Sequence, residues 1–338
     1  MTRTLPPAPR PAAARPGTTR GARPGTARRV LRTFAAVAGL PYIALKIAWV
    51  AGSEIGIPAG SPLLDHRTLL IVANTVSVVA DALVVVLARL LTEPWGLRVR
   101  AWLLAFPLWV ATGLLAPIMV AFPAQLVTAL FTGPGNRTAD GGPARPFLDE
   151  WVFGVVYGGF IVQGAALGAL FFLYARDRWG HLWRGTLGEL PARSTGAPVR
   201  IAAVTAAVLA VASAAPHVRW ALGSTAGLSA ARMAQRTSDV AVLEWTRVLF
   251  AAVAVGAVLL LVSRRPRGLP VLAVLGPGWV ATGGLGCWGA YLSLVSLMPE
   301  TDQEKAHSVL MEVTYAGEMI TGFLLAGCLA VFLRRRAA

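Results

Sequence analysis

Trp49-Val-Ala-Gly-Ser-Glu-Ile-Gly56 and Trp220-Ala-Leu-Gly-Ser-Thr-Ala-Gly227 are two copies of one pattern, Trp-x-x-Gly-Ser-x-x-Gly. Each copy follows an apolar run, and the two tryptophans lie 171 residues apart. Three residues before the tryptophan stands Lys46 in the first copy and His217 in the second. We interpret the two stretches as the same corner of a duplicated unit.

Further matches extend this duplication along the chain. Trp109-Val-Ala-Thr-Gly113 recurs 170 residues later as Trp279-Val-Ala-Thr-Gly283. A pattern of Tyr157, Gly159, Gly164 and Arg176 recurs 158 residues later as Tyr315, Gly317, Gly322 and Arg334. The order of the matches predicts two tandem units of four helices. Units with an even number of spans have the same orientation in the membrane, and sites in such parallel repeats commonly lie where the halves meet.

The composition is that of an integral membrane protein. Hydrophobic residues make up 56% of the 338 residues, charged residues make up 14%, and the mean hydropathy is +0.62. A soluble domain carries about a quarter charged residues. The apolar runs are about 20 residues long, enough to cross a bilayer core of roughly 30 Å. The sequence predicts an all-α polytopic membrane helix bundle in contact with the lipid bilayer, with eight transmembrane helices at residues 33–51, 68–89, 101–121, 151–174, 200–220, 241–262, 270–292 and 312–333.

Basic residues predict the orientation of these spans. Of the 31 lysines and arginines, 22 fall in the first 32 residues or after the even-numbered spans. The positive-inside rule therefore places both termini in the cytoplasm. The net charge of +15 reflects these loop arginines, so we infer no nucleic-acid partner from it.

The same pattern divides the chain into segments. We expect a disordered basic cytoplasmic tail at 1–32, because this stretch is rich in arginine and proline and has no acidic residue. The first repeat would occupy 33–174, a cytoplasmic linker 175–199 and the second repeat 200–338. Within the long outer loop, residues 124–131 are too few to span the bilayer and are expected at its interface.

Smaller signals concern packing. Gly-x-x-x-Gly pairs such as Gly154 with Gly158 permit close helix contact, within the chain or between copies of it, so homo-oligomerisation stays open. Cys287 and Cys328 fall at different expected depths, which argues against a disulfide.

Three residues of the first span are candidates for function. Tyr42, Lys46 and Trp49 are spaced to share one helix face. An ammonium about six residues inside the outer end either extends to the interface or holds a ligand or a buried carboxylate. Glu318 lies at the same expected depth and is the expected partner of Lys46. Asp81 lies roughly 10 Å deeper, too far for an easy direct pair, and is either a proton carrier or a protonated acid bonded to backbone.

A second group of candidates lies at the outer ends of spans five and six: His217, Arg219, Glu244 and Arg247. If these side chains face inward, they line a vestibule that opens to the outside. The alternative is that most of them are interfacial. Trp49, Trp220 and Trp245 lie at a similar depth, and we interpret them as an aromatic belt.

No catalytic or cofactor motif is present in the sequence. It has no Walker A loop, no His-Glu-x-x-His, no closely paired cysteines and no Gly-x-Ser-x-Gly elbow. The four histidines lie in or beside loops. We therefore assign no catalytic residue, no metal ligand and no cofactor.

The pattern Tyr42-x-x-x-Lys46-x-x-Trp49-x-x-Gly52 resembles the first-span signature of a family of uncharacterised actinobacterial multi-pass integral membrane proteins. The arginine- and proline-rich start of the chain fits that family too. The second copy departs from the signature, with His217 for the lysine and Ser213 for the tyrosine. The resemblance implies a bacterial origin and a multi-pass fold. It implies no mechanism, because the family has no assigned activity.

The parallel repeat and the membrane-embedded charges of both signs favour a permease or small-solute transporter of the bacterial plasma membrane, with an outward-facing polar vestibule. Lys46 would hold an anionic group of the solute or pair with Glu318, and Asp81 would carry a proton. The alternative is a non-catalytic membrane scaffold or signalling subunit. An enzyme acting on lipid would depend on His217 with Glu244 and is the least favoured class.

Overall fold

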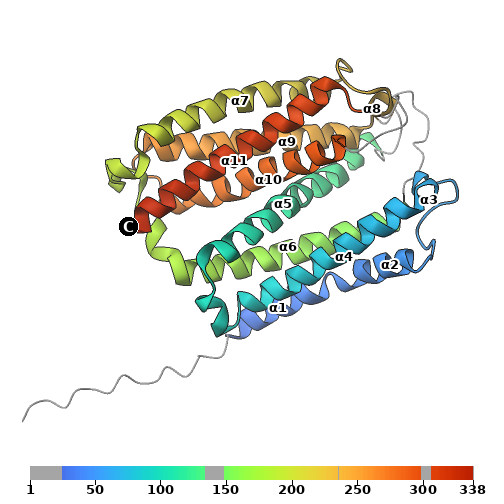
Figure 1. Cartoon of the computed structure of the whole chain (residues 1–338), viewed down its shortest axis with the longest axis horizontal. Coiled ribbons are helices and arrows are strands. Elements are labelled where there is room, and N and C mark those ends of the chain that lie inside the picture. Colours follow the sequence, from blue (N-terminus) through green and yellow to red (C-terminus); the bar gives the residue numbers. More distant parts are fainter. Residues whose placement is uncertain (1–24, 134–147, 235, 298–305, 338) are drawn as a thin grey trace, which may run out of the picture.

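The computed structural model describes residues 25–133, 148–234, 236–297 and 306–337, and within these ranges the fold is helical without a β-strand (Figure 1). Eight helices are long and apolar enough to cross a membrane, which confirms the expected all-α polytopic bundle. The long helices are α1 (Thr26–Val37) continued by α2 (Leu40–Val50), α4 (Arg67–Leu90), α5 (Ala101–Thr132), α6 (Glu150–Trp179), α7 (Ala197–Ala221), α9 (Ser238–Ser263), α10 (Val271–Ser296) and α11 (Val309–Ala337). The short elements are α3 (Pro62–Asp65), α8 (Ala230–Ala234) and the 3₁₀ turns η1 (Pro94–Arg98), η2 (Gly180–Trp183), η3 (Leu187–Glu189) and η4 (Ala192–Thr195).

The first helix begins earlier than the sequence predicts. Residues 26–32 were expected in the disordered tail, but they belong to α1. Two of their arginines find acidic partners on neighbouring elements: Arg28 pairs with Asp177, and Arg32 Nη1 lies 2.6 Å from Glu93 Oε1. These pairs hold the first turns against the ends of α4 and α6. The expected tail at residues 1–24 lies outside the described residues.

The first span is broken between α1 and α2. Pro41 has no backbone N–H to continue the hydrogen-bond ladder, and Ala38 and Gly39 form a turn at this point. Gln163 from α6 supports the break, because its Nε2 donates a hydrogen bond of 3.2 Å to the carbonyl of Ala35. The break brings Tyr42 and Gln163 next to the backbone of Gly39.

The expected interfacial segment at 124–131 is instead the end of α5. The helix continues through Pro107, Pro117 and Pro123 and ends at Thr132. Its last turns are tied to the start of α9, since Gln125 Nε2 donates a hydrogen bond of 3.1 Å to the carbonyl of Asp239. This tertiary contact and the apolar sequence explain why the helix does not end where the span was predicted to end.

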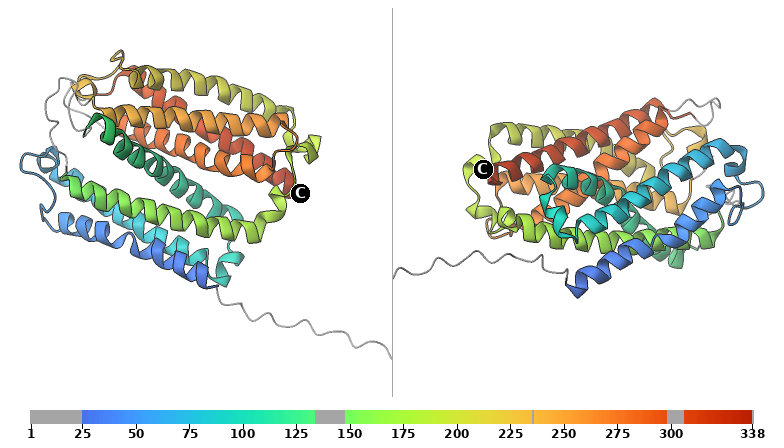
Figure 2. Two further views of the ribbon diagram at one scale, coloured as in Figure 1. Left: turned by 180° about the vertical axis from the view of Figure 1, so that it is seen from behind. Right: turned by 60° about the horizontal axis from the view of Figure 1, so that its bottom comes forward.

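The two halves share most of their helix neighbours. In the first half the α1–α2 span packs beside α4 and α6, and α5 packs beside α6. In the second half α7 packs beside α9 and α11, and α10 packs beside both of these helices. The halves meet through α5, which lies between α6 and α10 and contacts α10 and α9 more extensively than α4 (Figures 1 and 2).

Glycines allow the close approach of α5 and α10. A Cβ atom on Gly113 would lie 2.5 Å from the carbonyl carbon and oxygen of Gly283. These two glycines end the repeated Trp-Val-Ala-Thr-Gly patterns. The tryptophan of the first copy also links α5 to α10, because Trp109 Nε1 donates a hydrogen bond of 3.2 Å to Thr282 Oγ1. The two patterns thus meet where α5 packs on α10.

The repeated corners have one local structure. Trp49 Nε1 donates to the carbonyl of Ile55 at 2.7 Å, and Trp220 Nε1 donates to the carbonyl of Ala226 at 3.0 Å. Both motif glycines of each copy have a positive φ, between 75° and 109°, which glycine adopts at little cost. A Cβ on Gly56 would meet Val152 of α6, and a Cβ on Gly227 would meet Leu310 of α11. Val152 and Leu310 are themselves separated by the 158 residues that relate α6 to α11.

Arginine side chains fasten the end of the molecule that carries the C-terminus (Figure 1). The expected linker is folded there: α6 extends to Trp179, and η2, η3 and η4 follow. Leu187 and Leu190 of this segment are buried in the core of the second half. Arg264 donates to the carbonyl of Leu190 at 3.2 Å, and Arg336 donates to that of Leu182 at 3.0 Å.

Candidate functional site

A polar cluster of Tyr42, Lys46, Asp81 and Gln163, the first-half cluster, lies inside the first half. Lys46 Nζ lies 2.9 Å from Asp81 Oδ2. Tyr42 Oη lies 3.0 Å from Asp81 Oδ1 and 2.8 Å from Gln163 Oε1. Lys46 is 8% exposed and Asp81 is 7% exposed. The charges are therefore buried, paired and hydrogen-bonded, which is how a membrane interior tolerates them.

The expected pairing of Lys46 with Glu318 is wrong, because Lys46 pairs with Asp81. Residue counts give the depth of Cα atoms and do not include the direction of the side chains. Side chains on a helix lean toward its N-terminus. Lys46 and Asp81 lie on α2 and α4, which run in opposite directions, so the two side chains lean toward each other and close the gap between their Cα atoms.

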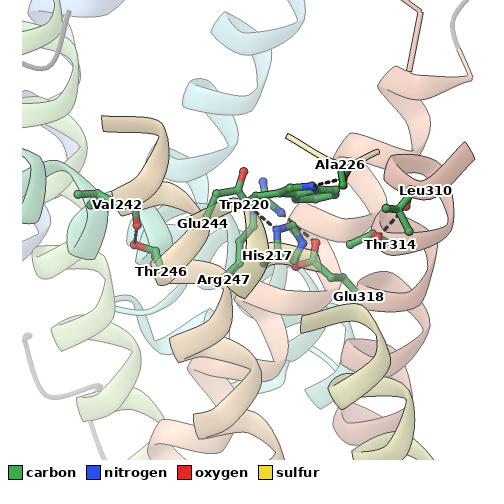
Figure 3. A network of polar contacts seen from close by, with 10 residues as sticks. All are labelled: His217, Trp220, Ala226, Val242, Glu244, Thr246, Arg247, Leu310, Thr314 and Glu318. Atoms are coloured by element: carbon green, nitrogen blue, oxygen red, sulfur yellow. Dashed lines mark hydrogen bonds and ion pairs between the residues drawn. The ribbon is translucent and has the colours of Figure 1, made fainter. Parts of the chain in front are cut away.

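A second cluster, made of His217, Glu244, Arg247 and Glu318, lies in the second half (Figure 3). His217 Nδ1 contacts Glu244, and His217 Nε2 lies 3.0 Å from Glu318 Oε1, close but poorly aligned for a hydrogen bond. Arg247 Nη1 donates to Glu318 Oε2 at 2.9 Å. The His217 side chain is 1% exposed and that of Glu318 is 3% exposed. This second-half cluster thus places an imidazole between two carboxylates, away from water.

Three of the four candidates predicted at the outer ends of spans five and six come together here. His217, Glu244 and Arg247 are in one cluster, and Glu318 joins them from α11. Arg219 is on the same helix as His217, but its side chain is exposed. It faces away because it is two residues from His217, which on a helix is nearly the opposite side.

The predicted aromatic belt is wrong for two of its three tryptophans. Trp49 and Trp220 are 7% and 4% exposed, and each binds a carbonyl of its own corner. Trp245 is 45% exposed and fits a belt position. The predicted shared face of Tyr42, Lys46 and Trp49 is confirmed, because all three side chains are buried on α2.

Lys46 and His217 occupy corresponding positions in the two clusters, but their surroundings differ in chemistry. Lys46 Nζ lies 5.7 Å from the centre of the Phe160 ring, whereas His217 lies beside Glu318. Phe160 and Glu318 are counterparts in the 158-residue register. The second half thus has a carboxylate where the first half has an aromatic ring, so its cluster carries a further charge.

A cavity of about 250 Å³ adjoins the second-half cluster. Arg247 and Glu318 form part of its wall, and Arg232 of α8 is a further cation on it. Most of the wall is apolar. The lining residues come from α5, α6, α8, α9, α10 and α11 and are Pro117, Ile118, Ala121, Phe122, Gln125, Tyr157, Arg232, Leu243, Thr246, Arg247, Phe250, Gly284, Leu285, Trp288, Leu292 and Glu318. The cavity therefore lies between the two halves.

Sequence reasoning missed several of these polar residues. Gln163 had a usable signal, since it is a polar side chain in the middle of an apolar span. Arg232 had no such signal, because the sequence around this arginine does not indicate that its side chain contacts a cavity. Among the described residues, no group of three or more His, Cys, Asp or Glu side chains is arranged to hold a metal ion.

Comparisons of the chain with protein-family models, with curated proteins and with solved structures found no match.

Proposed function

We propose that this chain is a small-solute permease of the bacterial plasma membrane, whose solute binds in the cavity between its halves. The observation that carries the proposal is a concave site of about 250 Å³ with a buried Arg247–Glu318 pair on a largely apolar wall. Ligand sites are concave and mostly apolar, with a few polar groups that orient the ligand. This volume lies just below the usual range of about 300–1,000 Å³, so the cavity accepts only small molecules.

The proposal includes a tandem duplication of a four-helix unit. Its support is the set of shared helix neighbours and the matching bonds of the two corners. In parallel repeats, the expected place for a solute is the junction of the halves. The cavity lies at this junction, with α5 from one half and α9, α10 and α11 from the other on its wall.

The arginine-rich end is assigned to the cytoplasm by the positive-inside rule, with both termini on that side. The cavity residues of α10, from Gly284 to Leu292, lie in the half of the helix away from that end. The cavity is then an outward-facing vestibule in the outer leaflet. The resemblance of the first span to actinobacterial membrane proteins agrees with a bacterial plasma membrane.

The roles of the candidate residues follow from their surroundings. Arg247 and Glu318 line the cavity and contact the solute. Lys46 pairs with Asp81 and lies over the rings of Tyr42 and Phe160, so its role is to hold α2 against α4. Lys46 was the residue expected from the sequence to bind an anionic group of the solute, and this role is now assigned to Arg247.

The experiment measures binding by purified protein in lipid nanodiscs. A panel of solutes of up to about ten non-hydrogen atoms is equilibrated across a dialysis membrane, and retained solutes are identified by mass spectrometry. Ala121→Phe fills the cavity, and Ile118→Trp fills it from another wall position in case the first variant does not fold. Ala80→Phe adds the same bulk to the exposed face of α4 and is the matched control.

We expect at least one solute to be retained by the wild type and by Ala80→Phe and to be lost from both filled variants. The same solute should cross proteoliposome membranes only with the wild type and the control. Retention without flux would favour a signalling subunit. If the wild type retains no solute and a constant protein partner is found in native membranes, the permease proposal is refuted in favour of a scaffold.

A further inference from the structure

We infer that the cavity binds a small apolar carboxylate together with one proton, which His217 holds. This inference rests on the proposed permease function and gives that function a substrate class and a coupled ion. It depends on three observations: the position of His217 between two carboxylates, the charges on the cavity wall, and the apolar character of the rest of the wall.

The first observation concerns the imidazole ring. Each of its nitrogens faces a carboxylate, Nδ1 that of Glu244 and Nε2 that of Glu318. A neutral imidazole has one N–H and one lone pair, so one carboxylate would face a lone pair. Only the imidazolium presents an N–H to both, and its charge is attracted by both carboxylates although Nε2 is poorly aligned for a hydrogen bond to Glu318. The position between two carboxylates therefore suits the protonated ring, and water has little access to it because His217 is 1% exposed.

The second observation is the charge balance of the groups around His217. Glu244 and Arg247 face it from α9, Tyr315 and Glu318 from α11, and Arg232 lies on the same cavity wall and near Tyr315. His307 reaches the group through the ring of Tyr315, 6.3 Å away. Arg236 shares a small pocket with Arg232, Glu244 and Tyr315. With a neutral His217, the two carboxylates therefore face three guanidinium groups, and protonation of His217 adds a further positive charge, which a bound anion offsets.

The guanidinium groups supply the contact for that anion. Arg247 uses Nη1 for Glu318, and a guanidinium has five N–H donors in a fork that matches a carboxylate. The Arg247 side chain is 18% exposed and lines the cavity. When a ligand carboxylate takes donors of Arg247, Glu318 keeps the imidazolium of His217 as its partner. No buried carboxylate is then left without a cation.

The third observation selects the remainder of the ligand. Phe122, Phe250, Leu285 and Trp288 belong to the wall beyond the arginines. Such a surface binds an apolar body, and the few uncharged polar groups of the wall, Gln125, Tyr157 and Thr246, offer few hydrogen bonds to a sugar or an amino acid backbone. The charge and the wall together favour a compact apolar acid.

The proton step is a simple transfer. A hydronium ion or buffer acid gives a proton to the free imidazole nitrogen of His217, and that nitrogen forms an N–H bond directed at its carboxylate. Binding of the anion and binding of the proton then favour each other by the same factor, because linkage is reciprocal. The net charge that enters the membrane with the ligand is zero.

The probe is benzoate, and benzamide and benzylamine are its neutral and cationic counterparts of similar shape. Binding to the full-length protein in phosphatidylcholine nanodiscs is measured by calorimetry between pH 6 and 9. Two buffers with different ionisation enthalpies give the number of protons taken up. We expect benzoate to bind and its counterparts not to bind. Benzoate affinity should fall by about tenfold per pH unit in the upper part of the range, with uptake approaching one proton.

The matched variants are His217→Gln and Arg219→Gln. The first keeps a polar side chain but cannot be protonated, so proton uptake and the pH dependence of benzoate affinity should disappear. The second removes an exposed cation from the same helix and should leave both unchanged. The double variant Arg247→Gln with Glu318→Gln removes the charged pair without leaving a lone buried charge, and it should lose benzoate binding.

Each outcome decides the inference. A wild-type benzoate affinity that is flat from pH 6 to 9, or an unchanged slope in His217→Gln, overturns it. Binding of benzylamine or benzamide in preference to benzoate overturns the substrate class, while the permease proposal stands because a solute still occupies the cavity. Both proposals are refuted if no solute, whatever its charge, binds the wild type more tightly than it binds Ala121→Phe.

Discussion

Lys46 and Asp81 form a buried ion pair whose second carboxylate oxygen contacts Tyr42. The sequence identified both residues as intramembrane charges but joined Lys46 to Glu318. The error has a physical cause. A depth estimated from residue counts places only the Cα atoms and ignores the direction of the side chains, and the lysine side chain is long enough to cover the remaining difference in depth. The gathering of His217, Glu244 and Arg247 could be predicted, because these residues lie at one depth on adjacent spans.

The pair gives a prediction at the scale of residues. Asp81→Asn leaves the Lys46 ammonium buried without its counter-ion and should destabilise the fold by about 3–5 kcal/mol, as removal of one partner of a buried pair does. Lys46→Met should be similarly harmful. The double variant leaves no lone charge and should unfold at a higher temperature than either single variant, measured by thermal unfolding in detergent. A double variant less stable than both singles would contradict the pairing.

At the scale of elements, the last glycine of the first corner and the glycine that follows it in the chain differ in their surroundings. Gly56 has φ +75° and its Cβ position lies 2.4 Å from Val152 Cγ2, whereas Gly60 has φ +83° and open space. Gly60→Ala should cost about 1–2 kcal/mol from backbone conformation alone. Gly56→Ala should cost about 1–3 kcal/mol more through overpacking against α6. Equal losses of thermal stability in the two variants would show that the corner does not pack on α6.

The contact of α5 with α10 gives a second prediction at this scale. Gly113→Ala or Gly283→Ala places a methyl group against backbone that cannot move aside. Both should lower the unfolding temperature and weaken any solute binding between the halves. Gly256→Ala on α9 meets nothing within 4 Å and should stabilise the protein by about 0.5–1 kcal/mol. Stabilisation by all three variants would exclude a tight helix contact.

The sequence placed all eight spans but not their ends. Hydropathy detects the part of a helix that suits a bilayer, and α1, α5, α6 and α11 continue beyond it. Their extensions depend on tertiary contacts, such as Arg28 with Asp177 and Gln125 with Asp239. Such contacts join residues far apart in the sequence, so no local sequence pattern predicts them.

At the scale of the whole molecule, the orientation is a prediction that labelling can check. Ala59 lies in the exposed turn between α2 and α3, and Gly268 lies in the exposed turn between α9 and α10, at opposite ends of the bundle. A membrane-impermeant maleimide should label Ala59→Cys in intact bacterial cells and Gly268→Cys only after permeabilisation. The native Cys287 and Cys328 are buried and serve as the background. The reverse pattern would invert the topology and place the cavity toward the cytoplasm.

Fold class and the number of spans could be predicted at this scale, because bilayer thickness sets the length of each apolar run and the runs can be counted in the sequence. The cavity could not be predicted, since it arises where six elements leave a space between them. The polar residues of its wall could be predicted from the sequence only in part. Arg247 and Glu318 were candidates, whereas the positions of Arg232 and Tyr157 at the cavity depend on how the helices pack.

The attachment of α5 to α9 and α10 has a consequence for movement. By sequence α5 belongs to the first half, but it packs more extensively on α9 and α10 than on α4 and α6. If the halves of the proposed permease move against each other, we expect the boundary along α5 and α6, and not through the linker at 175–199. Nearly all of the lining residues would then lie on one side of this boundary, and Tyr157 of α6 on the other. Such a movement would leave most ligand contacts intact and shift Tyr157 relative to the cavity.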